Sequence, residues 1–206
     1  FPGPGLAVRI LCADKPQLTD HVEERVKENA AKYGLHASVL PIRSVGVQGD
    51  HRSYGYVAVL SGKGHFPTLQ QAAQEIPRLV HEVNRVVYLF DRKVNGAKVC
   101  PTTIKKETIE LLQEADAIVR NKVKKYNLKI SQTPVVLLPI SLGKGRTIAI
   151  RPFITNDFMT GRAARLGKEM PIQCLKEIVH EVSAIHGIDG VMYDLTSKPP
   201  ATTEWE

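Results

Sequence analysis

Hydrophobic residues recur along the chain with two different spacings, which predict helices in some segments and strands in others. Four segments place apolar residues three or four positions apart, the spacing that lines one face of an α-helix. In one of them Leu69, Ile76 and Val83 share a face. In another, Pro171 stands in the first turn, where proline favours a helix start. The predicted helices span Leu18–Tyr33, Leu69–Val83, Glu107–Tyr126 and Pro171–Val182.

Segments rich in β-branched or alternating apolar residues predict two hairpins and two single strands. The hairpins turn at Gly49-Asp50-His51-Arg52 and at Gly143-Lys144-Gly145-Arg146, so Arg52 and Arg146 take equivalent turn positions. The predicted strands are Arg43–Gln48 with Tyr54–Leu60, Val135–Leu142 with Thr147–Ile154, and the short runs Arg85–Tyr88 and Gly190–Tyr193.

The order of these elements repeats along the chain, and so do parts of the sequence. Val39-Leu-Pro-Ile42 recurs as Leu137-Leu-Pro-Ile140, and Val80-His-Glu-Val83 recurs as Val179-His-Glu-Val182 at nearly equal spacing. We therefore predict an α+β fold of two tandem α-β-β-α-β repeats. Each would be a two-layer sandwich with an antiparallel sheet and its helices on one face.

A change in composition separates the two copies. Between Asp91 and Lys106 the chain turns to polar and turn-forming residues, so we place the boundary there. A second loop, Thr155–Met170, is rich in Arg and Gly and lies between a strand and a helix, where functional loops are common. The predicted organisation is a connector at 1–15, a first repeat at 16–92, a linker at 93–106 and a second repeat with a C-terminal tail at 107–206.

Composition narrows the functional classes. A length of 206 residues with 43% hydrophobic and 24% charged residues is ordinary for a soluble globular protein. No apolar run is long enough to cross a membrane. Cys12, Cys100 and Cys174 are odd in number and far apart, which favours a reduced, cytoplasmic protein with inert thiols. Neither the cysteines nor the seven histidines have metal-ligand spacing, so no metal site is predicted.

The formal net charge of +7 favours an anionic partner. The basic residues are dispersed, however, and the densest patch, Lys122-Val-Lys124-Lys125, lies on a predicted helix whose face we expect to be solvated. Aromatic residues make up only 6% of the chain, so platforms for stacking the bases of a single strand are few. We therefore do not expect a nucleic-acid partner.

The last fourteen residues, Tyr193–Glu206, carry an unusual set of groups for the end of a chain. The stiff Pro199-Pro200 step holds Lys198 and Glu204 on either side of it. With two neighbouring threonines, this arrangement suits a phosphorylated, hydrogen-bonding small molecule. The alternative is a tail that only docks on its own domain through Trp205.

Four stretches, spread over the chain, carry a resemblance to one family. They are Phe1-Pro-Gly-Pro-Gly-Leu6, Ser44–Tyr54, Asp157-Phe-Met-Thr160 and Asp194–Glu206. In this order they resemble the GMP synthases, glutamine-hydrolysing ligases that aminate xanthosine monophosphate (XMP). The resemblance covers essentially the whole chain but only the C-terminal portion of the enzyme, in its longer, duplicated form. The lack of an initiator Met fits a piece cut from a longer chain.

The resemblance implies an XMP site built from Asp50, Arg52, Gln132, Lys198 and Glu204. The Arg52 fork and the Lys198 ammonium suit phosphate oxygens. The Gln132 amide offers a donor and an acceptor to a purine edge, and the Glu204 carboxylate accepts from a purine N–H or a hydroxyl. Asp50 would bind a ribose hydroxyl. Without the resemblance, Asp50 is more simply a turn cap and Arg52 a solvated turn tip.

The resemblance also implies what the intact enzyme does. ATP, with magnesium, adenylates the purine carbonyl of XMP, and ammonia from glutamine then displaces AMP to give GMP. The sequence has neither a Ser-Gly-Gly-rich pyrophosphate loop nor a Cys-His-Glu glutaminase set. We therefore expect no catalytic residue, no bound cofactor and no activity from this piece alone. Its partners would be XMP and the ATP-cleaving and glutaminase domains of the same polypeptide, reached through residues 1–15.

Pairing of the two copies and two other functions stay open at this point. The copies are expected to pack by pseudo-twofold symmetry and replace an interface between subunits, and a homodimer is also compatible with the resemblance. One alternative is a purely structural pairing module. The other is an α+β RNA-binding module, which would need a basic groove lined with exposed aromatic residues. For the XMP site, the decisive expectation is that Lys198 and Arg52 converge.

Overall fold

The computed structural model describes residues 5–48, 51–90, 92–94, 96–157 and 159–206. Within these ranges the helices are η1 (Leu6–Arg9), α1 (Asp20–Ala31), α2 (Phe66–Leu79), α3 (Lys106–Lys125) and α4 (Ile172–Ser183). The strands are β1 (His36–Gln48), β2 (His51–Ser61), β3 (Val83–Leu89), β4 (Lys98–Val99), β5 (Val135–Leu138), β6 (Ile140–Ser141), β7 (Arg146–Ile150), β8 (Phe153–Ile154), β9 (Arg162–Ala163) and β10 (Ile188–Asp194).

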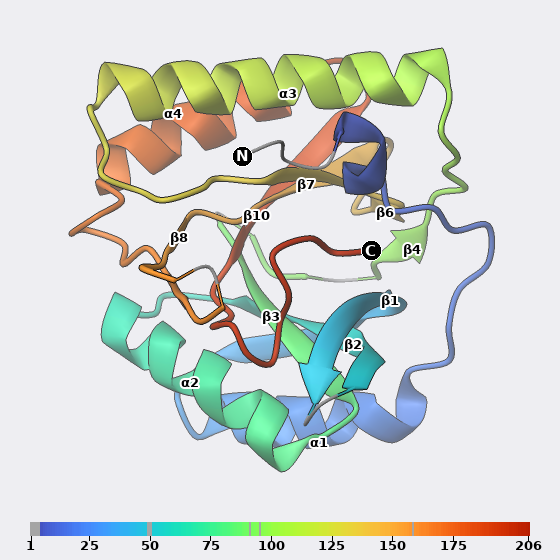
Figure 1. Ribbon diagram of the computed structural model, residues 1–206. Helices are drawn as coiled ribbons and strands as arrows, with labels where there is room; N and C mark the ends of the chain where they lie inside the picture. The colour runs from blue at the N-terminus through green and yellow to red at the C-terminus, as the bar shows by residue number, and fades with distance from the viewer. Residues whose placement is uncertain (1–4, 49–50, 91, 95, 158) are drawn as a thin grey trace.

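A six-stranded sheet in the order β1-β2-β3-β10-β7-β5 joins the two halves of the chain (Figure 1). At its centre β3 and β10 pair in antiparallel register, with Tyr88 opposite Tyr193. On either side, β2 runs parallel to β3 and β7 runs parallel to β10. The predicted α+β class is confirmed. The main sheet is mixed rather than wholly antiparallel as predicted, while the two small sheets, β4–β6 and β8–β9, are antiparallel. A helix separates the two strands of each parallel pair in the sequence, and such a crossover brings strands together in parallel.

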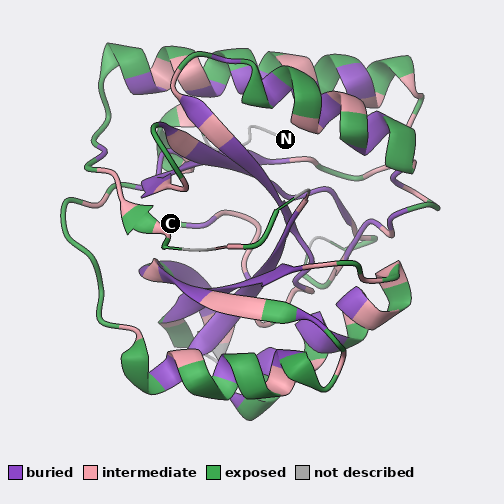
Figure 2. Cartoon of the chain, turned by 180° about the vertical axis from the view of Figure 1, so that it is seen from behind, coloured by how far each residue is buried: buried purple, intermediate pink, exposed green. Residues whose placement is uncertain are grey.

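The sheet curls, and its two faces are covered differently. Figure 1 shows α1 and α2 on one side of the molecule and α3 and α4 on the other, with the sheet between them. The larger hydrophobic core contains side chains from all four α-helices, among them Val26, Ile76, Leu112 and Ile178. A second core fills the inner face of the curl, and its described members come from strands, loops and Trp205 of the C-terminal tail. Figure 2 shows the buried strands between helices whose outer faces are exposed.

Two prolines explain why the observed strands differ in their bounds from the predicted ones. β1 begins at His36, although the predicted strand began only at Arg43. The strand continues through Pro41 because the pairing register with β2 shifts between Leu40 and Arg43, and a bulge at this place tolerates a proline. Pro139 ends β5 at Leu138, and β6 leaves the main sheet to pair with β4. β4 lies inside the predicted linker, so that linker is partly folded onto the second half of the chain.

The two Val-His-Glu-Val blocks have different structures. Val179–Val182 lies within α4, whereas Val80 follows the end of α2 and Val83 begins β3. The predicted helix end at Val83 is therefore wrong. Pro67 lies in the first turn of α2, so the helix begins before Leu69. This sequence match does not mark structurally equivalent positions.

None of the described helices combines the length and the hydrophobicity needed to cross a bilayer.

Candidate functional site

The C-terminal tail, residues 195–206, lies along the first hairpin. The Val45 N–H donates to the Trp205 carbonyl at 2.9 Å, and the Val47 N–H donates to the Pro200 carbonyl at 2.8 Å. These bonds occupy backbone positions at the outer edge of the sheet, where β1 has no further strand beside it. The tail thus continues from the second half of the chain onto the first.

The loop between β8 and β9 contacts the tail from the other side. Lys198 and Gly161 exchange two backbone hydrogen bonds, of 2.8 and 3.0 Å. Within this loop Asp157 accepts from the N–H groups of Met159 and Thr160 at 2.9 and 2.8 Å, and these bonds lower the pKa of its carboxyl. Asp157 thereby holds the backbone of Met159 and Thr160, next to the residue that bonds to the tail.

Arg85 of β3 binds the backbone of the tail through its side chain. Its buried guanidinium donates to the carbonyls of Glu204 at 3.0 Å, Val45 at 3.3 Å and Thr202 at 3.4 Å. It also lies over the Trp205 ring, 4.5 Å from the centroid. One side chain therefore fixes the backbone and the aromatic group of the tail.

A buried ion cluster supports this anchor. Asp194 Oδ2 lies 2.7 Å from Arg85 and 2.9 Å from Arg151, and Arg151 donates to the Thr196 carbonyl at 2.9 Å. Burial opposes ionisation of Asp194, but the two guanidinium groups outweigh burial and lower the pKa of this carboxyl. Burial lowers the pKa of Arg85 to about 10, so the residue stays charged at neutral pH.

Lys198 and Glu204, the two predicted site residues of the tail, are both half-buried. The Lys198 ammonium donates to Thr203 Oγ1 at 3.2 Å. Glu204 Oε2 lies 3.4 Å from Arg9 Nε, and neither of these atoms has a hydrogen-bond partner within the described residues. Arg9 in turn lies 4.0 Å from Asp116, which pairs with Arg120 at 2.7 Å. The Glu204 carboxylate thus borders a chain of charged groups.

Gln132 lines a cleft of about 560 Å³ that also reaches Arg9. Its backbone pairs with Phe153, through bonds of 3.3 and 3.0 Å, and leaves the side chain exposed. Arg120 and Lys124 of α3 line the same cleft, so its rim carries several cations. Arg9 thus belongs both to the lining of this cleft and to the ion pair with Glu204.

Arg52 lies exposed at the start of β2, opposite Val47. Since the Val47 N–H donates to Pro200, the hairpin end that carries Arg52 is bonded to the segment that follows Lys198. Asp50 lies outside the described residues. The structure thus brings the backbone segments of Arg52, Lys198 and Glu204 together, while Gln132 shares a cleft with Arg9, the partner of Glu204.

Arg146, the turn residue of the second hairpin, has a different environment from Arg52. Its guanidinium donates to Thr102 at 2.9 Å and pairs with Glu107 at 3.2 Å. This arginine is therefore held by the start of α3.

Sequence reasoning did not identify Arg9 or Arg85 as parts of this region. Arg85 carried a signal, because a charged residue within a continuous buried strand requires a partner. Arg9 carried none, since its partners are remote in the sequence. Cys174 is buried in α4, where burial raises the pKa of its thiol to about 11, as suits an inert core cysteine.

Comparison with known proteins identifies the family. Residues 120–205 match the family described as the GMP synthase C terminal domain. Over its whole length the chain is 39% identical to the glutamine-hydrolyzing GMP synthase of Dictyostelium discoideum, of which it covers 36%. The chain belongs to the GMP synthase family.

Other GMP synthases align with different shares of the chain. The probable GMP synthase of Caenorhabditis elegans is 33% identical over the whole chain, which covers 38% of that protein. The GMP synthase of Syntrophomonas wolfei is 44% identical over 48% of the chain and 21% of its own length. The chain thus spans little more than a third of the GMP synthases that align with all of it.

Proposed function

We propose that this region binds XMP and holds it for a glutamine-hydrolysing GMP synthase, which makes GMP from XMP, ATP and glutamine in the cytoplasm. The ATP-cleaving and glutaminase sites, with the ATP and magnesium that they use, would belong to other domains of the same polypeptide. This region would contribute position and charge rather than acid–base chemistry. Alone it would be inactive.

One observation carries the proposal: the tail that bears Lys198 and Glu204 is bonded to the hairpin end that bears Arg52. Two cations, one from each half of the chain, would suit the oxygens of one phosphate group. Asp50, next to this hairpin end in the sequence, would take a ribose hydroxyl. Gln132, which lines the same cleft as Arg9, and Glu204, which pairs with Arg9, would take the purine edge, which offers both donors and acceptors.

We also propose that the two halves replace an interface between subunits. The two halves of the sheet have the same arrangement on either side of the central β3–β10 pair. In each half the central strand has a parallel neighbour, β2 or β7, and this neighbour has an antiparallel partner at the edge, β1 or β5. This arrangement supports pseudo-twofold packing within one chain. A homodimer of the intact enzyme would then use another surface.

Substitution of Lys198 in the intact enzyme tests the XMP site. We expect Lys198→Ala to raise the Michaelis constant for XMP by about tenfold to 150-fold, since a hydrogen bond to a charged group contributes ~1.5–3 kcal/mol. The constants for ATP and glutamine should not change. Steady-state kinetics with each substrate varied in turn measure all three.

Lys168→Ala is the matched control, because Lys168 is an exposed lysine in the neighbouring loop. An unchanged Michaelis constant for XMP in Lys198→Ala would remove Lys198 from the site. Equal effects of the two substitutions would reduce its role to general positive charge. A purely structural pairing module would show neither effect.

A further inference from the structure

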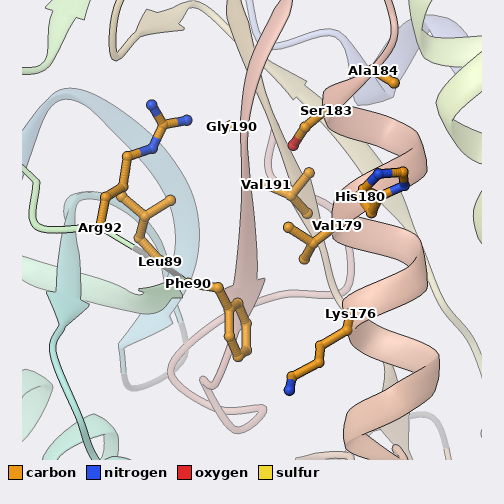
Figure 3. Close-up of a pocket in the computed structure, with 10 residues that line it drawn as sticks. All are labelled: Leu89, Phe90, Arg92, Lys176, Val179, His180, Ser183, Ala184, Gly190 and Val191. Atoms are coloured by element: carbon orange, nitrogen blue, oxygen red, sulfur yellow. The ribbon is translucent and has the colours of Figure 1, made fainter.

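A groove runs over the centre of the sheet on its helix side, where β3 and β10 meet. Two clefts of about 440 and 620 Å³ adjoin there and share Phe90 and Arg92. One wall is the face of α4 that carries Lys176 and His180, as Figure 3 shows. The opposite wall is the loop before α2, with Lys63. The groove therefore lies between the helix pairs of the two halves.

The charged groups that line the groove have one sign. They are Lys63, Arg92, Lys93 and Lys176, with His65 and His180 beside them. No aspartate or glutamate lines either cleft in the part of the chain that the structure describes. Over the same residues none of the three lysines forms an ion pair. A concentration of cations without counter-ions attracts anions.

The floor of the groove is apolar and partly aromatic. Phe90 is half-buried, and its ring meets the Tyr88 ring edge-on at 4.7 Å between centroids. The Tyr88 hydroxyl donates to the Gly62 carbonyl and thereby ties this floor to the loop that carries Lys63. Val179 and Val191 complete the apolar surface (Figure 3). A flat ligand could thus stack on Phe90 with cations on both sides.

We propose that this groove binds a nucleoside triphosphate, with its base on Phe90 and its phosphates on the surrounding lysines and Arg92. Four cations suit several phosphate charges, and the volume of each cleft lies within the range of small-molecule sites. A single-stranded nucleic acid would need several stacking rings. Among the described lining residues, Phe90 carries the one phenyl or phenol ring that is not buried, with only the small imidazoles of His65 and His180 besides. An acidic peptide would make no use of this ring.

The groove goes beyond the proposed XMP function and is separate from it on the molecule. It shares no lining residue with the Gln132 cleft. Among the described residues the surface around Phe90 is formed by Val179 and Val191, and the Tyr88 hydroxyl is already bonded to Gly62, so ATP and GTP should bind alike.

Fluorescence anisotropy of mant-GTP, titrated with the chain at low and at physiological salt, measures this binding directly. We expect saturable binding that weakens with salt and that ATP and GTP reverse equally. The double substitution Lys63→Ala with Lys176→Ala should weaken binding by about tenfold or more. Lys106→Ala, which removes an exposed lysine of α3, is the matched control and should not change it.

Two further comparisons separate this ligand from others. Phe90→Ala should weaken mant-GTP by about fivefold or more through lost stacking, while the affinity for inorganic triphosphate stays unchanged. Lys198→Ala and Glu204→Gln should leave mant-GTP binding intact, because they alter only the XMP site. The inference is overturned if mant-GTP does not bind at low salt, if Phe90→Ala has no effect, or if an oligonucleotide binds and the triphosphates do not compete.

Discussion

At the scale of single residues, the contact between Arg9 and Glu204 deserves a functional explanation. Both side chains are about a fifth exposed, and their facing atoms have no hydrogen-bond partner among the described residues. A pair held in this way orients the carboxylate without occupying both of its oxygens. Under the proposed function, Arg9, in the predicted connector, would position Glu204 for XMP.

Replacement of Arg9 by methionine tests this role. Arg9→Met keeps most of the length and apolar volume of the side chain but removes the charge. We expect the Michaelis constant for XMP of the intact enzyme to rise about fivefold, since a partly exposed ion pair contributes roughly 1 kcal/mol. Turnover at saturating XMP should be unchanged, because the Glu204 carboxylate can still bind XMP when the site is fully occupied.

Arg78→Met is the control for this experiment, because Arg78 is an exposed arginine of α2. A fall in turnover without a change in the Michaelis constant would contradict a positioning role. If Arg9→Met and Arg78→Met changed the Michaelis constant equally, the change would be due to net charge rather than to the contact with Glu204.

At the scale of elements, the tail depends on the ion cluster at the ends of β10, β7 and β3. Asp194 lies between Arg85 and Arg151, and all three side chains are buried. Without Asp194, two buried guanidinium groups would lack their counter-ion. A buried ion pair adds little relative to an apolar pair, but removal of one partner is costly.

We therefore expect Asp194→Asn to lower the free energy of unfolding by ~3–5 kcal/mol at pH 7, measured by urea denaturation. The pKa of Asp194 is lowered in the folded chain, so its stabilisation is present above the ordinary value of 3.8 and is lost as the pH falls through the folded pKa. The difference between wild type and variant should shrink below pH 3.8.

Asp14→Asn provides the comparison, since Asp14 is an exposed aspartate of the connector. A difference that persists unchanged at low pH would show that the effect comes from packing rather than charge.

Helices were more predictable from the sequence than strands. The helical spacing between Glu107 and Tyr126 gave bounds within one residue of α3, because one apolar stripe and its flanking charges mark both ends. The strands depend on remote partners: the bulge at Pro41 forms only against β2, and Ile140 pairs with β4. The predicted convergence of tail and first hairpin rested on the family resemblance, since no local pattern specifies it.

At the scale of the whole molecule, the two halves share one sheet and exchange covering segments. The tail follows β10 but covers β1, and Asp194 neutralises Arg85 of the first half. The second hydrophobic core likewise contains residues of both halves, such as Val57 and Met192. Neither half is complete by itself.

Expression of the chain as two pieces, 1–104 and 105–206, tests this dependence. Ile104 is exposed and precedes α3, so a cut there breaks no described helix or strand. We expect the pieces to associate one to one and to unfold together, whereas each alone should unfold at a lower temperature or aggregate. Size-exclusion chromatography with light scattering and thermal unfolding followed by circular dichroism give the result. Melting of either isolated piece at the temperature of the whole chain would contradict it.

The two hairpins have different surroundings, and under the proposed function this difference limits the number of XMP molecules that the chain can bind. The first hairpin faces a tail with an ammonium group and a carboxylate, whereas Arg146 of the second is already matched by Glu107. β3 is the counterpart of β10 in the first half, but it is followed by a link to β4 and not by a second tail. Under the proposed function, two similar halves therefore form one XMP site, so that doubling the framework does not double the number of substrate molecules held.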